Sequence, residues 1–497
     1  MSKLDSLIVL INSMDSADKR YFGLHNQIYE GEKDYQLLYE IIQNNYTDAD
    51  TVRTEFKRER PGASFEIACK HLYHKLLDRL STRDTETEIE FGVLKSYQQA
   101  RFLFKRNLCK ESLQLITKTK NIALEYELFS HFLLLAKLEI QIHNQLEFSE
   151  MDEDQLVKKQ SKIESVSRQQ RAIENHTGLY NLISLRQIKH GTVRNEEEKI
   201  KLNDLAFNEL QAISGQNKNS FEAQKLHLLF QSAYFMKTGN PKSSLKVYYE
   251  LNELFEQNRK LWGNPPFFYI NHIRGILNNL RWFGNYKEMP YFIDKLGNLT
   301  IEFPATQSVI KPLIFIFESL ILTDQKLYTE AQDHLFRMWP DITEKQSGLT
   351  FATQAEIALQ AAVVHFWNQN YKQALKVIRP ILNTGKPFSQ QPQTKPIRFL
   401  NILIHCKLGD QDYLDSEIRS FERDLKKSGK LLESEAIILK TVNLIRLGGH
   451  HHKQTKKLKQ TKENLLKLKA SPFERQFLNS FNYIEWLEPY INHDQNI

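Results

Sequence analysis

A short local pattern recurs four times in the second half of the chain and constrains its fold more than any other feature. Each copy reads as the end of an apolar helix, a tight polar break and the start of a second amphipathic helix: WFGNYKEM (282–289), QKLYTEA (325–331), NQNYKQA (368–374) and KLGDQDYL (407–414). The copies are 42, 43 and 40 residues apart when they are aligned on Met289, Ala331, Ala374 and Leu414. Such a period is typical of helical-repeat solenoids, in which each helix pair buries its apolar face against its neighbours.

The composition also favours helix. Among 497 residues there are only 18 Gly and 14 Pro, and 26% of the residues are charged. Few helix breakers among many strong helix formers indicate an all-α protein. The three cysteines, Cys69, Cys109 and Cys406, are far apart, so they predict neither a disulfide framework nor a zinc site and fit a reducing compartment.

No segment has the character of a membrane span or a secretory signal. The most apolar stretch, 312–322, carries Glu318 and is about half of the roughly 20 residues that a bilayer requires. The N-terminal apolar run from Leu7 to Ile11 is too short for a signal peptide and has no small-residue cleavage site after it. We therefore expect a cytoplasmic protein without membrane association, in which 312–322 is a buried helix.

The chain is expected to have three parts. Residues 1–85 form a small helical N-terminal domain, in which the segment 64–80 has an apolar face made by Phe65, Ala68, Leu72, Leu76 and Leu80. Residues 90–470 form the helix pairs, with later pairs at 265–303, 306–340, 350–384, 393–428 and 431–469. Residues 471–497 form a C-terminal capping helix over 472–490, because an open solenoid end exposes an apolar face.

Between the early and late pairs the sequence has drifted. Ser112 and Ser244 occupy similar places after a break and lie 132 residues apart, which is three steps of 44. Two further units are therefore predicted between them, with candidate helices at 128–147, 152–172, 173–190 and 195–214.

The residue types at each break between helices can be explained physically. Two helices joined by a few residues need a position that tolerates positive φ, which glycine supplies at 239, 284, 409 and 448. The next helix must then approach closely, so a small side chain near its first turn is favoured, as at Ala331 and Ala374. A larger side chain there is expected to cost about 1–3 kcal/mol through overpacking.

The break followed by Ala-Leu resembles the tetratricopeptide repeat, most clearly in AVVHFWNQNYKQALKVIRPIL (362–382). The period of about 42 is longer than that family's usual spacing, so the chain is similar to an extended form of the repeat. The resemblance implies a right-handed solenoid of antiparallel helix pairs that binds a protein or peptide and is not an enzyme. It therefore predicts a scaffold or adaptor.

Motifs that carry chemistry are nearly absent from the sequence: Ser16 and Lys19 match the short S-x-x-K pattern, which a chain of this length contains by chance. There is no phosphate-binding loop, His-Glu-x-x-His pair or nucleophile elbow. His71 and His74 lie three residues apart without further ligands at suitable spacing, and the run 450–452 of histidines falls in a predicted turn. We therefore expect no catalytic residues, no metal and no cofactor.

The concave surface of the repeats is the expected ligand site. Arg274, Asn278 and Arg281 follow one another at i, i+4 and i+7 in one helix, with Asn271 a turn earlier and Trp282 beside them. Such a strip could hold an extended peptide by donating hydrogen bonds to its carbonyls or its terminal carboxylate.

An alternative role is that of a ligand-sensing regulator. Eight Lys or Arg and four acidic residues lie between positions 53 and 83, and the segment 64–80 could enter a DNA groove through Lys70, Lys75, Arg79 and Arg83. The N-terminal domain would then contact nucleic acid or a signalling protein. A second basic segment, 453–469, has seven lysines and one acid, which is typical of a solvated helix face.

Overall fold

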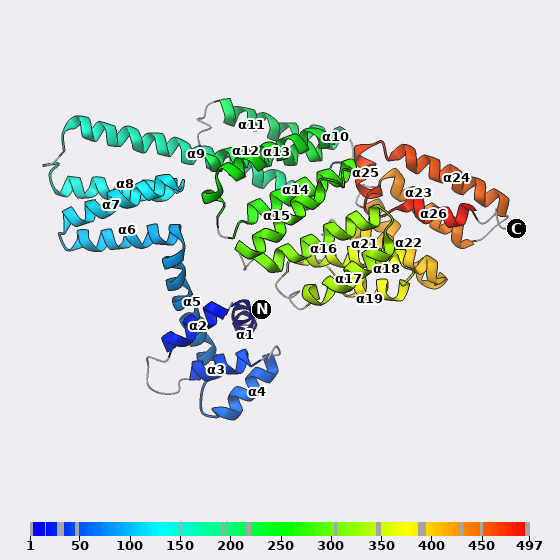
Figure 1. The fold of residues 1–497 in the computed structure, drawn as a ribbon, viewed down its shortest axis with the longest axis horizontal. Coiled ribbons are helices and arrows are strands. Elements are labelled where there is room, and N and C mark those ends of the chain that lie inside the picture. Colours follow the sequence, from blue (N-terminus) through cyan, green and yellow to red (C-terminus); the bar gives the residue numbers. More distant parts are fainter. Residues whose placement is uncertain are drawn as a thin grey trace. The chain divides into compact units, whose positions relative to one another are not determined.

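The structure, a computed structural model, describes residues 3–14, 16–26, 34–44, 49–149, 151–190, 193, 196–214, 220–263, 265–302, 306–343, 349–385, 394–427, 431–447 and 451–492. Over these ranges all regular structure is helical and there is no strand (Figure 1). The prediction of an all-α fold is confirmed. Among the same residues no helix is both long and apolar enough to cross a bilayer.

The chain divides into two compact units, residues 1–170 and 171–497, with the boundary inside helix α9. The boundaries expected near residues 85 and 470 describe a different division and stay predictions.

The first unit begins with five helices that share one core. Its helices are α1 (Lys3–Ser13), α2 (Ser16–Asn26), α3 (Asp34–Gln43), α4 (Ala49–Glu59), α5 (Phe65–Thr87), α6 (Ile89–Lys105), α7 (Cys109–Glu125), α8 (Phe129–Gln145) and the first part of α9 (Glu153–His190). The predicted apolar face of α5 is confirmed, because Phe65, Ala68, Leu72 and Leu76 are buried against α1 to α4.

Helix α9 differs from the expected arrangement. The segments 152–172 and 173–190 were predicted as two helices, but the structure has one continuous helix of 38 residues. No Gly or Pro occurs between 165 and 177, and a Cβ added at Gly178 would meet nothing within 4 Å. Nothing in the local sequence therefore stops the helix.

The second unit has two described helices in each of the five segments predicted between 265 and 469. Its helices are α10 (Glu196–Ile200), α11 (Asn203–Ser214), α12 (Phe221–Lys237), α13 (Pro241–Gln257), the 3-10 turn η1 (Arg259–Leu261), α14 (Phe267–Phe283), α15 (Met289–Glu302), α16 (Gln307–Asp324), α17 (Tyr328–Thr343), α18 (Phe351–Trp367), α19 (Tyr371–Leu382), α21 (Thr394–Leu408), α22 (Gln411–Lys427), α23 (Glu433–Leu447), α24 (His451–Leu468), α25 (Pro472–Leu478) and α26 (Tyr483–Asn492). Most of them pack on the next helix in sequence or the one after it.

The C-terminal segment is two helices and not the single helix predicted over 472–490. Residues 479–482 separate α25 from α26. The polar sequence of this break explains it, since the side chain of Asn482 accepts a hydrogen bond from the backbone N–H of Glu485 at 3.3 Å and so starts α26.

One turn geometry recurs along the second unit. A residue with φ between 60° and 76° follows a helix at Gly239, Gly284, Lys326, Gln369 and Gly409. In each case the next backbone N–H donates to the carbonyl five residues earlier, at 2.8–3.2 Å, the arrangement that ends a helix with a left-handed residue. The prediction of positive φ is confirmed at the three glycines, and Gly448 lies outside the described residues.

The fifth residue after each of these turns is fully buried: Ser244, Met289, Ala331, Ala374 and Leu414. Ala331 and Ala374 are buried as expected, but Met289 and Leu414 are buried at the equivalent positions, so a small side chain is not required at every one of these turns.

Ser112 and Ser244 also have matching contacts. Each hydroxyl donates to the backbone carbonyl twelve residues earlier, Ser112 to Ala100 at 2.8 Å and Ser244 to Ser232 at 3.0 Å. Two serines 132 residues apart thus play the same local role.

Replacing Gln369 by glycine is expected to stabilise the second unit by about 0.5–1 kcal/mol. The left-handed conformation costs a residue with a Cβ about 1–2 kcal/mol, and glycine removes this cost. Glycine also raises the conformational entropy of the unfolded chain, which offsets part of the stabilisation. Gln369 is exposed, so little packing is lost. Urea unfolding would measure the change, with Gln373→Gly in the first turn of α19 as a destabilising control. A loss of stability in Gln369→Gly would contradict the prediction.

Candidate functional site

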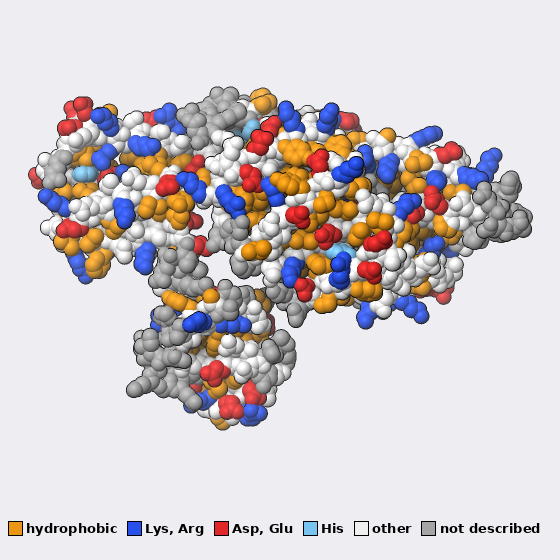
Figure 2. All heavy atoms as spheres, in the orientation of Figure 1, with side chains coloured by type: hydrophobic (Ala, Val, Ile, Leu, Met, Phe, Trp, Pro, Cys, Tyr) orange, Lys and Arg blue, Asp and Glu red, His pale blue; other side chains and the backbone are white. Residues whose placement is uncertain are grey.

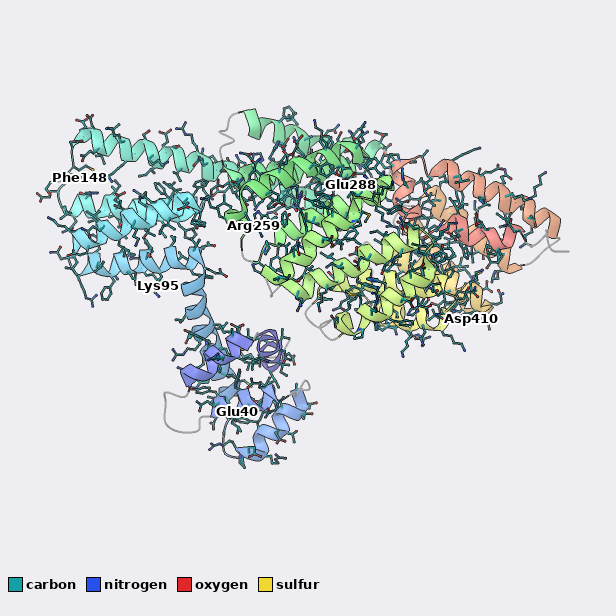
Figure 3. The ribbon with its side chains drawn as sticks, in the orientation of Figure 1. Glu40, Lys95, Phe148, Arg259, Glu288 and Asp410 are labelled. Atoms are coloured by element: carbon teal, nitrogen blue, oxygen red, sulfur yellow. The ribbon has the colours of Figure 1, made fainter. Side chains whose placement is uncertain are left out.

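A cavity of about 250 Å³ lies in the second unit, where the C-terminal ends of α14, α16 and α18 meet residues 469–482. Its lining combines charged, aromatic and polar side chains: Arg281, Trp282, Tyr286, Thr323, Asp324, Gln360, Trp367, Lys469, Arg475, Asn479, Ser480, Phe481 and Asn482. We call it the C-terminal pocket. Figure 1 shows α25 beside the end of α14, and in Figure 3 Glu288 marks the turn after α14 on the side of these C-terminal helices.

Helix α14 places Arg281 and Trp282 at the rim of this pocket. Its stripe of Ile273, Ile276, Leu277 and Leu280 is fully buried, which fixes the orientation of the helix. The guanidinium of Arg281 then meets the carboxylate of Asp324, with Nε–Oδ2 at 2.7 Å and Nη2–Oδ1 at 3.0 Å. Arg281 Nη2 also donates to the backbone carbonyl of Asn479 at 2.8 Å, which ties the C-terminal segment to α14.

The negative charge of Asp324 is paired with the positive charge of Arg281. Burial opposes the charge of Arg281, but the adjacent Asp324 carboxylate outweighs it and raises the pKa of Arg281. The hydroxyl of Tyr286 donates to Asp324 Oδ2 at 3.0 Å, and burial together with this carboxylate raises the pKa of Tyr286 to about 12. Tyr286 therefore stays a neutral donor at physiological pH.

Arg475 and Lys469 add positive charge that no carboxylate of the described residues pairs with. Arg475 Nη2 donates to the backbone carbonyl of Trp282 at 2.6 Å, and its Cζ lies 5.0 Å from the centre of the Trp282 ring. Among the described residues, neither cation has an acidic partner within 4.0 Å. With Asp324 matched by Arg281, the described lining carries two positive charges in excess.

This imbalance is local. The whole chain has a formal charge of only +7, and Figure 2 shows Lys and Arg interspersed with Asp and Glu over the visible face of residues 171–497. The attraction for an anion therefore comes from the pocket itself and not from a field over the unit.

Aromatic rings form the wall beside these charges. Trp367 and Phe481 stack with ring centres 5.1 Å apart and planes at 9°, and Tyr328 stacks on Trp367 at 5.1 Å and 11°. Phe481 also meets the edge of Phe366 at 5.1 Å. Trp367 and Phe481 thus lie in the pocket lining together with Arg475 and Lys469, and their rings stack on each other.

Only part of the predicted ligand strip reaches the pocket. Arg281 and Trp282 line it, whereas Asn271, Arg274 and Asn278 do not. Arg274 Nη2 is already bonded to Glu356 Oε2 at 2.5 Å, and Asn271 and Asn278 are exposed along α14. The two arginines expected to hold a peptide therefore hold other helices of the protein.

Asp324, Trp367, Lys469 and Arg475 line the pocket but carry no local pattern that predicts them as site residues. The contact between Arg475 and Trp282 joins positions 193 apart, and that between Arg281 and Asn479 joins positions 198 apart. No local spacing carries such information. The one available signal is the set of aromatic residues in 472–490, among them Phe477, Phe481 and Trp486, in the segment expected to form the capping helix.

The residues considered for nucleic acid do not form a uniform basic surface. On α5, Lys70 is exposed, Lys75 and Arg79 are half-buried, and the side chain of Arg83 lies outside the described ones. The exposed positions of the same helix include Glu66, Asp78 and Ile67, the last 66% exposed. The described part of α5 thus presents mixed chemistry, and nucleic-acid binding stays a prediction.

Comparison with protein-family models, with curated proteins and with solved structures gives no match to this chain. The described lining of the C-terminal pocket has no histidine or cysteine and a single, arginine-paired carboxylate, so it offers no set of metal ligands.

Proposed function

We propose that this chain is a cytoplasmic, non-enzymatic helical-repeat protein of the tetratricopeptide-like class that binds another protein or a peptide. The recurring left-handed turns, spaced by 45, 42, 43 and 40 residues from Gly239 to Gly409, support a right-handed solenoid of antiparallel helix pairs. The packing of most helices on near neighbours in sequence supports it as well.

The C-terminal pocket carries the more specific part of the proposal. Its volume of about 250 Å³ is below the usual range for a drug-sized ligand but suits one amino-acid side chain or chain end. Arg475 and Lys469 would bind a carboxylate, and the Trp367–Phe481 stack would cover the adjoining apolar part. We propose that the partner inserts its C-terminal residue here, each charged hydrogen bond contributing about 1.5–3 kcal/mol.

The lining also favours binding over catalysis. Tyr286 remains protonated, since its pKa is raised to about 12, and Asp324 is held by Arg281 and Tyr286. Tyr286 is therefore not poised to accept a proton near neutral pH.

Binding can be tested with a library of short fluorescent peptides, each made with a free and with an amidated C-terminus. Free carboxylates are expected to bind at least about tenfold more tightly, as one charged hydrogen bond is worth about 1.5–3 kcal/mol. Arg475→Gln and Lys469→Gln should each weaken binding of the free form. Fluorescence polarisation measures both comparisons.

The peptide-binding experiment needs a folding check and a control variant. Arg475 also bonds to the Trp282 carbonyl, so circular dichroism should verify that Arg475→Gln is folded; Lys469 is exposed and carries no such risk. Lys467→Gln is the matched control, because Lys467 is exposed in the last turn of α24, two residues before Lys469, but does not line the pocket. Equal binding of free and amidated peptides, unchanged by either pocket variant, would refute the proposal.

A further inference from the structure

A second group of polar side chains lies in the unit 171–497 and does not line the C-terminal pocket. It consists of His176 on α9, Glu209 on α11 and His227 on α12. One nitrogen or oxygen from each residue lies within 4.8 Å of those from the other two. Three separate helices therefore bring two imidazoles and one carboxylate to the same point.

The group is inside the protein and still reachable from solvent. His176 is 6% exposed and Glu209 3%, whereas the side chain of His227 keeps 15% of its surface exposed. Nδ1 of His227 is in contact with Oε1 of Glu209, and the two imidazole rings meet edge to face with centres 5.8 Å apart. The cluster is therefore unlike the exposed acidic groups that are common on protein surfaces.

The charge of Glu209 needs a counter-charge at this depth, since a buried carboxylate is costly unless it is paired. Lys225, two residues before His227, does not supply it, because its ammonium bonds to Glu222 Oε2 at 2.6 Å and lies over the rings of Phe221 and Phe268. The described partner of Glu209 is His227, which is uncharged unless protonated.

We propose that His176, Glu209 and His227 bind a divalent transition-metal ion of the Zn²⁺ type. Two imidazole nitrogens and one carboxylate oxygen are a ligand set that Zn²⁺ uses, with a fourth position left for water or an incoming ligand. Ligand atoms around tetrahedral Zn²⁺ lie roughly 3.4 Å apart. Side-chain rotations that move the ligand atoms by about an ångström therefore bring them to this spacing. The ion ties α9 to α11 and α12.

The spacing explains why the sequence did not reveal this site. The three residues are 33 and 18 positions apart, and no pair of them fits a helical i, i+3 or i, i+4 arrangement. The expectation of no metal was based on short motifs, whereas this ligand set depends on the packing of three helices.

Cobalt binding tests the proposal on the full-length protein, prepared without an affinity tag and treated with a chelator. His450, His451 and His452 should be replaced by alanine in every sample, because they offer an unrelated metal-binding run. We expect about one Co²⁺ per chain, with the intense visible absorption of four- or five-coordinate cobalt, displaced by Zn²⁺. Weak binding with only the faint spectrum of six-coordinate cobalt would overturn the proposal.

Variants identify the ligands. Glu209→Gln and His227→Ala should each weaken cobalt binding at least about tenfold and lose the intense absorption. His71→Gln/His74→Gln is the matched control: it removes a histidine pair from α5, in the other unit, and should leave binding unchanged. Circular dichroism verifies that each variant is folded. Tight binding that survives both ligand variants would show that the three residues form only a hydrogen-bonded network.

Discussion

Acidification from pH 7 to pH 5 is expected to destabilise the second unit by about 2 kcal/mol through His272 alone. This histidine is fully buried in α14 among aromatic rings, with ring centres of Phe255 at 5.3 Å, Tyr248 at 5.6 Å and Tyr269 at 6.0 Å. Burial, with a smaller effect of Lys295, lowers the pKa of His272 to about 3 from its usual 6.5. The imidazole is therefore neutral in the folded protein.

The sign of the effect follows from proton uptake. Below pH 6.5 the unfolded chain protonates His272 and the folded chain does not until about pH 3, so stability is complete above pH 6.5 and falls as the pH is lowered through this range. Each pH unit costs about 1.4 kcal/mol. Burial also lowers the pKa values of His334 and His365, which act in the same direction.

The variant His272→Leu separates this histidine from the others. Within the described structure, neither of its ring nitrogens has a hydrogen-bond partner, so a leucine should be tolerated at pH 7 with little or no loss of stability. Urea unfolding followed by tryptophan fluorescence measures the effect selectively, because all five tryptophans lie in residues 171–497. The variant should lose about 2 kcal/mol less than the unaltered protein between pH 7 and pH 5. An identical loss in both proteins would show that His272 is protonated in the folded state.

Replacing Gly275 by alanine is expected to cost about 1–3 kcal/mol, although the same change in an unconstrained helix stabilises by about 1 kcal/mol. A Cβ at position 275 would lie 2.3–2.5 Å from ring atoms of Tyr248, so this ring must move out of its place between α13 and α14. The missing Cβ of Gly275 therefore leaves the space that the Tyr248 ring fills.

The matched control is Gly297→Ala in α15, where an added Cβ meets nothing within 4 Å. It should stabilise or leave stability unchanged, and urea unfolding compares the two variants directly. Combining Gly275→Ala with Tyr248→Leu should give a loss smaller than the sum of the single losses, because the clash is relieved. Additive losses would mean that Tyr248 is not the group displaced.

Local sequence information was sufficient for the helices and for many of their ends. Gly284 and Gly409 lie at left-handed turns because their lack of a Cβ makes this conformation cheap, and a reader of sequence can use that rule. Lys326 and Gln369 adopt the same conformation without being glycine. There the packing of the flanking helices overrides the preference of the single residue, so only the repeat alignment indicated the turn.

The site depended on information that local patterns do not contain. Arg281 and Trp282 were identified because they follow a clear apolar stripe in α14, but their partners come from α16, α18 and the segment 469–482. Arg274 was expected to meet a ligand and instead meets Glu356, 82 positions away. A polar residue on a helix face is equally compatible with both outcomes until its neighbours are known.

The long sequence separation between Arg475 and Trp282 has a kinetic consequence. Helices that contact near neighbours in the chain can assemble quickly, whereas a join across 193 positions requires closing a long loop. During refolding, helical signal should therefore return before ligand-binding competence, with a measurable lag between them. A molecule can be nearly fully helical and still be inactive until residues 469–482 have docked.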